Sequence, residues 1–447
     1  MFHHLPEYAE LTETPVGWAP RLPRHWGLER GKSLFERVQR EPLDSDGVVT
    51  CFRDGVVTLR SRRRSTGFTE SLKEIGYQGI RKGDLVIHAM DAFAGAAGVS
   101  DSDGKGTPVY SVCVPRRNAN PNYYAAVVRE MARSSWILAL SKGVRERSTD
   151  FRFEMFGAQL LPVPTPAEQA AIVKYLDHAN ARIERAISAK RRLVDLLDER
   201  KAAVAAEAIR NIDATSRELR HVLRKLVDCE HKTAPYVEDG ESWILRTASV
   251  KRGKIDWSGA YPTNAEAYKA WTQRAVPAPG DVIFTREAPV GEAAVIPAGR
   301  KVALGQRTVL MKVRGEVMNP QFLVHQIYYG LPKGRIALAT QGSTVEHFNM
   351  DDIGWMRVTV PELAEQERVV AEIERASRKS DDAIAKTQRE ISLIQEYRTR
   401  LVADVVTGRV DVRAIAARLP DAPEMFDELD LILDDKLEDA LGEHLEE

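Results

Sequence analysis

Two long stretches of the chain carry apolar residues at helical spacing and contain neither proline nor glycine. The first runs from Ala167 to Ile209 and the second from Ala364 to Thr407. Apolar residues recur every three or four positions along one side of each, which is typical of a coiled-coil seam. The first seam comprises Ile172, Leu176, Ala179, Ile183, Ala186, Leu193, Leu197 and Val204, with Lys190 and Arg200 as interruptions, and the second comprises Val369, Ile373, Ala376, Ile384, Ile391, Ile394, Leu401 and Val405. A helix of roughly 43 residues is on the order of 65 Å long. Because neither could bury such a stripe alone, we expect the two helices to pair antiparallel.

The ends of these helices are marked in the sequence. Thr165 and Glu168 have the spacing of a capping box, and Pro166 stands at the first helical position. Gly408 is suited to end the second helix. The second helix has no threonine aligned with Thr165, so its capping must differ.

The two helices belong to a repeat. The sequence PTPAEQ at 164–169 is matched by PELAEQ at 361–366, an offset of 197 residues (361 − 164). The same offset relates GDLVI at 83–87 to GDVIF at 280–284, and Phe151 to Phe348. We therefore expect a duplicated unit in which a globular domain is followed by a long helix.

Short β-like runs alternate with turn signals outside these helices, and 123–140 is predicted to be one helix. The expected fold class is mixed α/β, with two globular domains separated by two long antiparallel coiled-coil helices and an internal two-fold repeat. The predicted segments are a weakly ordered N-terminal segment (1–20), a first globular domain (21–163), a first long helix (164–214), a second globular domain (215–360), a second long helix (361–410) and an acidic C-terminal tail (411–447).

Charge is distributed unevenly along the chain. Its formal net charge is −1, yet residues 421–447 hold twelve acidic residues and one lysine, so 1–420 carry +10. A basic body with an acidic tail indicates a polyanionic partner such as nucleic acid; the alternative is a solvated surface with a disordered tail. The tail is also predicted to contain an amphipathic helix, with Phe426, Leu429, Leu433, Leu437 and Leu441 on one face. Its acids either occupy a basic surface and suppress non-specific binding or serve only to solubilise the protein.

Composition and motifs narrow the class of protein. No apolar run is long enough to span a membrane, no secretion signal is evident, and three cysteines fit a reducing cytoplasm, where we expect the protein to reside. The phosphate-loop-like segment 98–105 and the methyltransferase-like 120–123 both depart from their motifs. Cys229 and His231 make a poor zinc site without a second pair. We expect no catalytic residue and no metal in this chain.

Candidate DNA-contacting residues are basic or carry amides. Arginines suit phosphate or guanine, and amides pair well with adenine. For each candidate the alternative is a solvated surface loop. The candidates are Arg60, Arg62, Arg63, Arg64, Arg145, Arg147, His231, Lys232, Thr233, Lys251, Arg252, Lys254, Gln306, His347 and Asn349.

The order of domain, Pro-x-x-x-Glu-Gln helix, domain, Pro-x-x-x-Glu-Gln helix resembles the specificity subunit of Type I restriction–modification enzymes, over about residues 21–410. The motif residues are Pro164, Glu168, Gln169, Pro361, Glu365 and Gln366, together with the two Gly-Asp motifs and Gly342 to Val345. The first unit departs from the pattern at Gly143 to Glu146, which lacks the serine and threonine.

The resemblance implies that each globular domain is a target-recognition domain reading one half of a split sequence in double-stranded DNA. The helices would set the gap between half-sites. Two modification (methyltransferase) subunits would bring S-adenosylmethionine and methylate adenine, and restriction subunits would use ATP and Mg²⁺. This chain would bind no cofactor and no membrane.

Two other interpretations stay open. The chain could be a non-catalytic coiled-coil adaptor with two protein-binding domains, or a DNA-acting enzyme with an unrecognised site. Binding that weakens steeply with salt indicates phosphate contacts and separates a DNA reader from the adaptor.

Overall fold

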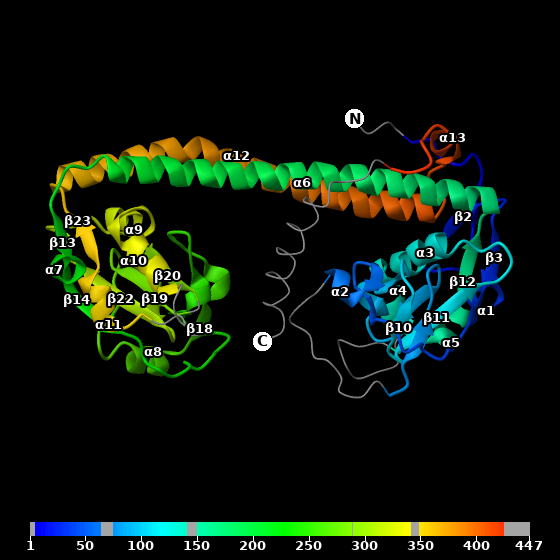
Figure 1. The fold of residues 1–447 in the computed structure, drawn as a ribbon, viewed down its shortest axis with the longest axis horizontal. Helices are drawn as coiled ribbons and strands as arrows, with labels where there is room; N and C mark the ends of the chain where they lie inside the picture. The colour runs from blue at the N-terminus through cyan, green and yellow to red at the C-terminus, as the bar shows by residue number, and fades with distance from the viewer. Residues whose placement is uncertain (1–4, 64–74, 141–149, 288, 341–347, 424–447) are drawn as a thin grey trace. The chain divides into compact units, whose positions relative to one another are not determined.

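A computed structural model describes residues 5–63, 75–140, 150–287, 289–340 and 348–423. Its chain divides into two compact units. Unit 1 comprises 1–191 and 389–447, and unit 2 comprises 192–388. Each unit contains one globular domain and a part of each long helix (Figure 1).

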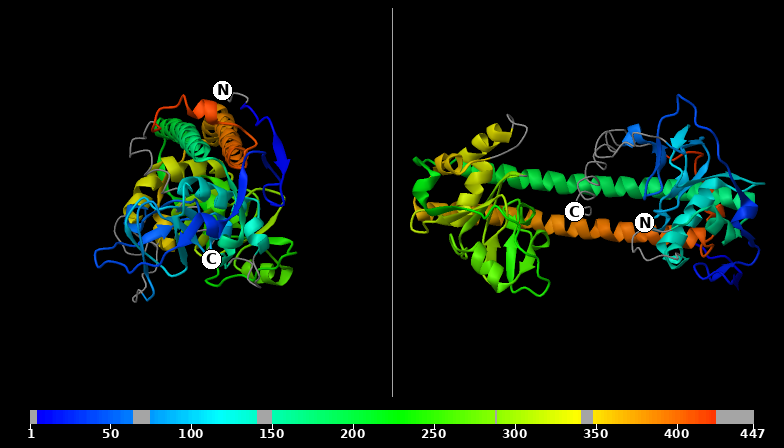
Figure 2. Two further views of the ribbon diagram at one scale, coloured as in Figure 1. Left: turned by 90° about the vertical axis from the view of Figure 1, so that its right-hand side faces the viewer. Right: turned by 90° about the horizontal axis from the view of Figure 1, so that it is seen from below.

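The two predicted long helices are present as α6 (Pro166–Arg210) and α12 (Leu363–Val406). In unit 1, Glu184 pairs with Arg398, and Lys190 Nζ lies 2.5 Å from Glu390 Oε2. In unit 2, Lys201 Nζ lies 2.5 Å from Asp381 Oδ1. From one of these ion pairs to the next, the residue number increases along α6 and decreases along α12. In each unit the two helices lie side by side (Figure 2). The predicted antiparallel pairing is confirmed.

The predicted seam holds near the helix ends and fails between them. Ile172, Ile373 and Leu401 are buried, whereas Leu193 is 46% exposed. In the middle of the helices the contacts are made by polar residues. Ser380 and Thr387 of α12 are buried there, and Lys190 and Lys201 of α6 pair with carboxylates of α12. An α-helix drifts about 20° per heptad from a strict seven-residue repeat, so one straight stripe does not stay at the interface throughout. Ile187 is accordingly buried in place of the expected Ala186, which is exposed.

The globular domain of unit 1 is built on a four-stranded antiparallel sheet in the order β4-β11-β8-β9. These strands are β4 (Phe35–Arg37), β11 (Tyr110–Pro115), β8 (Leu85–His88) and β9 (Ala97–Val99). Four two-stranded pairs accompany it: β1 (Leu11–Glu13) with β2 (Arg21–Pro23), β3 (Gly27–Arg30) with β12 (Leu160–Val163), β5 (Val49–Cys51) with β6 (Val57–Leu59), and β7 (Gln78–Ile80) with β10 (Gly104–Gly106). The helices are α1 (Gly31–Leu34), α2 (Arg60–Arg63), η1 (Ala92–Ala94), α3 (Pro121–Arg133), α4 (Trp136–Leu140), α5 (Phe153–Ala158) and α13 (Arg413–Ala416).

Unit 2 repeats this sheet as β14-β22-β19-β20, which confirms the internal repeat. The strands are β14 (Leu223–Asp228), β22 (Thr308–Val313), β19 (Val282–Arg286) and β20 (Val290–Val295). Further strands are β13 (Ser216–Glu218) with β23 (Arg357–Thr359), β16 (Val250–Lys251) with β17 (Lys254–Ile255), and the sheet of β18 (Tyr261–Thr263), β15 (Ser242–Leu245) and β21 (Lys301–Leu304). The helices are α7 (Leu219–Val222), η2 (Thr247–Ser249), η3 (Trp257–Gly259), α8 (Ala265–Trp271), α9 (Pro320–Tyr329), α10 (Leu331–Thr340) and α11 (Met350–Trp355).

The repeated Gly-Asp motif forms the turn before the central strands β8 and β19. Gly83 and Gly280 have φ of 93° and 88°, a region that favours glycine. The aspartate that follows closes the turn, because Asp84 Oδ2 accepts from the Arg81 N–H at 2.7 Å, and Asp281 Oδ2 accepts from the Ala278 N–H at 2.8 Å. The motif is therefore a structural device in both units.

The glutamine of each Pro-x-x-x-Glu-Gln motif fastens a long helix to its domain. Gln169 Oε1 accepts from the Asn120 N–H just before α3, at 2.8 Å, and its Nε2 donates to the Pro164 carbonyl, at 2.9 Å. Gln366 repeats both bonds with Asn319 and Pro361, at the same two distances. Both glutamines are buried. The motif therefore sets how each helix leaves its domain.

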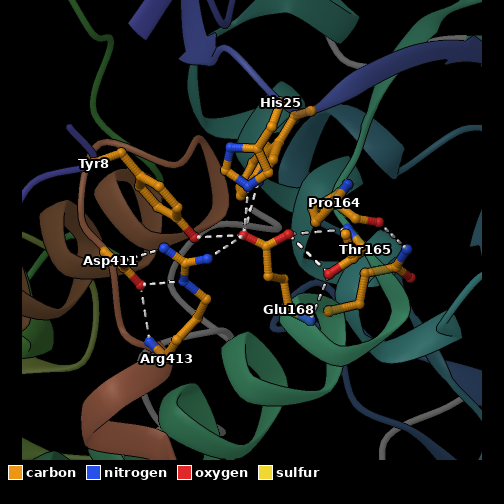
Figure 3. A network of polar contacts seen from close by, with 9 residues as sticks. Tyr8, His25, Pro164, Thr165, Glu168, Asp411 and Arg413 are labelled. Atoms are coloured by element: carbon orange, nitrogen blue, oxygen red, sulfur yellow. Dashed lines mark hydrogen bonds and ion pairs between the residues drawn. The ribbon is translucent and has the colours of Figure 1, made fainter. Parts of the chain in front are cut away.

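The glutamates of the two motifs differ. Glu168 forms the predicted capping box: its Oε2 accepts from the Thr165 N–H at 3.1 Å, and its own N–H donates to Thr165 Oγ1 at 3.3 Å. The Thr165 hydroxyl also donates to Oε2 at 2.9 Å. Its buried Oε1 also lies at the centre of a network, drawn in Figure 3. Oε1 accepts from Tyr8 (3.3 Å), His25 (2.8 Å) and Trp26 (3.4 Å), and Arg413 lies 3.6 Å away. Glu365 instead makes an exposed pair with Arg368, so the capping of α12 differs as expected.

Two further sequence expectations are wrong. Residues 5–20 are built into unit 1, with Tyr8 and Trp18 buried and β1 paired to β2, because the segment supplies aromatic side chains to the core. The expected helix over 123–140 is broken, because Ser135 has a φ of 59° that a helix does not accommodate. The predicted tail helix at 426–441 lies outside the described residues. The domain limits stay a prediction.

Within the described part of the chain, no helix combines the length and apolar character needed to cross a bilayer.

We predict that Glu168→Gln destabilises the fold and that the loss depends on pH. Burial would raise the pKa of the Glu168 carboxyl, but hydrogen bonds from His25 and Thr165 outweigh it and lower that pKa below 4.5. The charged form therefore stabilises the fold above the unfolded-state pKa, and this stabilisation is lost as pH falls through the folded-state pKa. Urea unfolding at neutral pH should show a loss on the order of 2 kcal/mol. The difference from wild type should shrink at acidic pH.

Glu365→Gln is the matched control for this measurement. Glu365 is the equivalent residue of the second motif, and it lies at the surface with Arg368. Its substitution should leave the unfolding curve nearly unchanged, because exposed pairs contribute little. Equal losses in both variants would contradict the role assigned to the Glu168 network.

Candidate nucleic-acid interface

The predicted arginine cluster of unit 1 lies on a helical turn, α2, rather than on the expected loop. Arg60 Nε donates to Thr50 Oγ1 at 3.1 Å. Arg62 donates to Ser102 Oγ at 2.9 Å and lies 3.6 Å from Asp101. Arg62 remains 59% exposed, so it is presented to solvent beside a carboxylate.

Arg63 is much less exposed than Arg62. It pairs with Asp54 at 2.7 Å and lies over the Phe52 ring, 4.4 Å from its centroid. Arginine stacked on an aromatic ring and paired with a carboxylate is held in place. Arg63 thus anchors α2 to the turn between β5 and β6 and leaves Arg62 as the outward cation.

Some predicted residues lie outside the described residues. They are Arg64, Arg145, Arg147 and His347, together with the motif residues 143–146 and 342–345. Their part in any interface stays a prediction.

In unit 2 the structure gathers several candidates at one edge of the sheet. Asp228, at the end of β14, is opposite Val309 of β22, and Thr308 is opposite Thr285 near the end of β19. Phe348 N–H donates to the Arg286 carbonyl at 3.0 Å, as Phe151 does to Ala89 in unit 1. The segments that carry the predicted DNA-contacting residues directly adjoin these strand ends and Phe348. The fold therefore brings together residues that are far apart in the sequence. The candidates concerned are His231, Lys232, Thr233, Gln306 and Asn349, all exposed.

A layer of ion pairs lies beneath these candidates. Asp228 Oδ2 lies 3.2 Å from both His231 Nε2 and Arg286 Nη1. Arg307, next to Gln306, pairs with Glu287 at 3.2 Å. These contacts fix the backbone of the edge and leave the Gln306 amide at a turn, where it is accessible to a partner.

Asn349 also has a structural role. Its Oδ1 accepts from the Asp352 N–H at 2.8 Å, which caps α11. One lone pair of Oδ1 and both amide N–H groups remain for a base edge, so a test must separate the cap from the contact.

The other three predicted DNA-contacting residues of unit 2 lie away from this edge of the sheet. Lys251, Arg252 and Lys254 belong to the β16–β17 hairpin, whose Gly253 pairs with Ala294 of the edge strand β20. Arg252 Nη1 lies 2.8 Å from Asp198 Oδ2 of α6, and Lys251 pairs with Asp256. The structure therefore fastens this hairpin to the long helix and separates it from the sheet-edge group.

Sequence reasoning missed a second arginine group in unit 1. Arg53, Arg129, Arg133, Arg191 and Arg398 line a cavity of about 1130 Å³ together with Arg62 and Arg63. They come from the β5–β6 turn, α3, α6 and α12, so no local pattern in the sequence joins them. Only the pairing of the helices and their attachment to the domain bring these residues together.

The cysteine and histidine considered for a metal do not form a ligand set in the fold. Cys51, Cys113 and Cys229 are buried free thiols, and burial raises the pKa of Cys51 to about 12. Among the described residues, no group of three His, Cys, Asp or Glu side chains is placed to hold a metal ion.

No protein-family model matches this sequence, and no curated protein matches it. Solved structures do match. A chain from a structure on complex assembly and conformational transition of the type I R-M system is 15% identical, with a TM-score of 0.59 over 86% of this chain and 98% of that chain.

Two further structures are similar at lower scores. The HsdS subunit from Thermoanaerobacter tengcongensis is 17% identical over 89% of this chain and 100% of that chain, with a TM-score of 0.41. The S subunit of a Type-I restriction-modification system from M. genitalium is 14% identical over 85% and 96%, with a TM-score of 0.34. The match with a TM-score of 0.59 shows that this chain has the fold seen in a chain of a type I R-M system.

Proposed function

We propose that this chain is the DNA sequence-specificity subunit of a Type I restriction–modification complex. The observation that carries the proposal is the duplicated unit: the same strand order and the same two glutamine hydrogen bonds recur on each long helix. The fold shared with a chain of a type I R-M system supports it. Two copies of one unit suit the reading of a bipartite sequence, one half per unit.

The chemistry of the sheet edge in unit 2 suits base reading. Gln306 and Asn349 carry amides that match the adenine edge, and Lys232 provides a charge for phosphate. In unit 1, Arg62 is the exposed arginine of the α2 cluster that points to solvent, and its guanidinium suits phosphate or guanine. Different side chains on one repeated frame fit two domains that read different half-sites.

The long helices are proposed to set the gap between half-sites. The 45 residues of α6 span roughly 67 Å at about 1.5 Å per residue. Duplex DNA advances about 3.4 Å per base pair, so this length corresponds to about twenty base pairs. Tethering two weak readers to rigid helices makes tight binding depend on both.

The chemical steps are assigned to partners. Two modification subunits would bind S-adenosylmethionine and methylate adenine, and restriction subunits would use ATP and Mg²⁺. The proposed role of this chain is sequence choice and scaffolding in the cytoplasm. The predicted limits 21–163 and 215–360 define the pieces that would carry each half of the specificity.

We predict that exchanging one domain changes one half of the methylated sequence. Residues 21–163 would be replaced by the corresponding domain of another specificity subunit and expressed with modification subunits, keeping β3 and β12 together because they pair. Sequencing of methylated DNA should show one new half-site and one unchanged half-site at the same spacing. The reciprocal exchange of 215–360 is the control and should change the other half. A change in both halves, or in neither, would overturn modular reading.

We predict that Asn349→Asp weakens DNA binding without weakening the fold. Aspartate caps a helix as well as asparagine does, so the unfolding free energy should stay within about 0.5 kcal/mol. Loss of the amide donors should reduce affinity for a duplex selected by the wild-type chain by about ten-fold to a hundred-fold. Fluorescence anisotropy measures this loss.

Asn264→Asp makes the same change of charge at the cap of α8, where Asn264 accepts from the Ala267 N–H. Affinity in this control should remain at the wild-type value. If Asn349→Asp also binds like wild type, Asn349 serves only as a cap.

A further inference from the structure

The arginine-lined cavity of unit 1 combines two kinds of surface. Its volume is about 1130 Å³, and apolar side chains such as Phe93, Val99, Leu176 and Val402 form part of the wall. Seven arginines and five carboxylates line the rest. A site for a bare phosphate would need no such apolar wall. The lining instead suits a ligand that is apolar on one side and acidic on the other.

Several of the carboxylates are already engaged. Arg398 pairs with Glu184, Arg133 with Glu130, and Arg62 lies 3.6 Å from Asp101. Arg129, by contrast, makes no hydrogen bond or ion pair with any other described residue. It is exposed, and it lines the cavity from α3. The nearest carboxylate that acts on its charge is Asp54, which is already paired with Arg63, so the Arg129 guanidinium is available to an acidic ligand.

Unit 2 has a different side chain at the position equivalent to Arg129. Gly55 of unit 1 lies against Gly98 of β9, as Gly253 of unit 2 pairs with Ala294 of β20, and both glycines have positive φ. Arg129 stands nine residues after the Asn120 cap of α3, and Tyr328 stands nine residues after the Asn319 cap of α9. These positions are therefore equivalent.

At its position, Tyr328 fastens the turn to the helix. Its hydroxyl accepts from the Gly253 N–H at 3.0 Å and donates to Glu292 at 2.6 Å, while Arg252 reaches Asp198 of α6. Arg129 only packs over Gly55, where an added Cβ would meet its Cδ at 2.7 Å. Unit 1 thus leaves open a place that unit 2 bridges with its own side chains.

The last described residues contact α6, the helix that also forms part of the cavity wall. The Pro420 carbonyl lies 2.9 Å from His178 Nε2, and Asp421 pairs with Lys174 at 3.1 Å. Both partners belong to α6, within one helical turn of Leu176 and Asp177 in the cavity wall. At about 100° per residue these two partners lie on another face of α6 from the residues of the cavity wall. The chain beyond Pro423 therefore starts across α6 from the cavity. Residues 424–447 extended would reach roughly 80 Å, which is enough to pass around the helix and enter the cavity.

The composition of 424–447 matches the lining. It holds eleven acidic residues and one lysine, and its apolar residues are spaced for one helix face. A helix about 10 Å wide and about ten residues long occupies on the order of 1200 Å³, close to the cavity volume. We propose that the acidic segment 424–447 docks in the unit 1 cavity, with its apolar residues on the wall and its acids toward Arg129 and neighbouring arginines. This intramolecular docking does not depend on the proposed function.

Site-specific photocrosslinking in the full-length chain tests the docking. A photoreactive phenylalanine analogue at Leu433 should crosslink within the same molecule to the lining segments 53–58, 93–99 or 125–133, identified by mass spectrometry. Arg129→Glu should reduce the yield at least about five-fold by like-charge repulsion. Arg375→Glu, at an arginine of α12 in unit 2, is the matched control and should leave the yield unchanged.

A second variant protects the test against misfolding. Asp427→Asn, Glu428→Gln and Asp430→Asn together remove three tail charges outside the described fold and should lower the yield as Arg129→Glu does. Four outcomes would each overturn the proposal: crosslinks to unit 2, crosslinks only between molecules, no crosslinks, or a yield that neither variant changes.

Discussion

A buried side-chain amide fastens each globular domain to the start of a long helix, and the recurring arrangement of domain and helix depends on that contact. Gln169 and Gln366 both accept from the backbone N–H before the packed helix of the domain and donate to the carbonyl before the long helix. Gln366 also donates to the Val317 carbonyl at 2.9 Å. Loss of either amide would leave buried backbone groups unpaired, at about 1–3 kcal/mol each. Because these two bonds recur in both units, each domain meets the start of its helix with a similar local geometry.

The two units share a backbone framework of sheet, turn and helix attachment, and they differ in the side chains around it. Sheet order, the Gly-Asp turn and the glutamine contact recur, whereas Glu168 has four side-chain donors where Glu365 has one surface arginine. Likewise, Arg129 faces a cavity where Tyr328 closes a turn. A frame fixed by backbone hydrogen bonds tolerates such changes because they lie on its surface or at its ends. This separation suits a protein in which two copies of one unit have different binding tasks.

The parts of the fold that local patterns encode could be predicted from the sequence. The start of α6 follows from the Thr165–Glu168 capping box, its antiparallel partner follows from the two one-sided stripes, and the repeat follows from a constant offset. The break at Ser135 was missed because no glycine or proline marks it. The burial of Tyr8 and Trp18 was missed because it depends on contacts with residues more than a hundred positions away.

The candidate interface was harder to predict for the same reason. Composition identified basic segments, but it could not show that Arg63 is paired with Asp54, that Asn349 caps a helix, or that Arg252 is fastened to α6. The cavity arginines lie between positions 53 and 398, and only the tertiary fold assembles them. Charge identifies a class of partner, whereas the position of each charge depends on packing that no short motif records.

The central claim is that two equivalent units read two separate pieces of one duplex. The most direct measurement is selection of bound duplexes from a random-sequence pool by the full-length chain with its modification partners, followed by sequencing. The account predicts two short defined sequences separated by a gap of constant length and no sequence preference. A single uninterrupted motif, a gap of variable length, or no enrichment would contradict it.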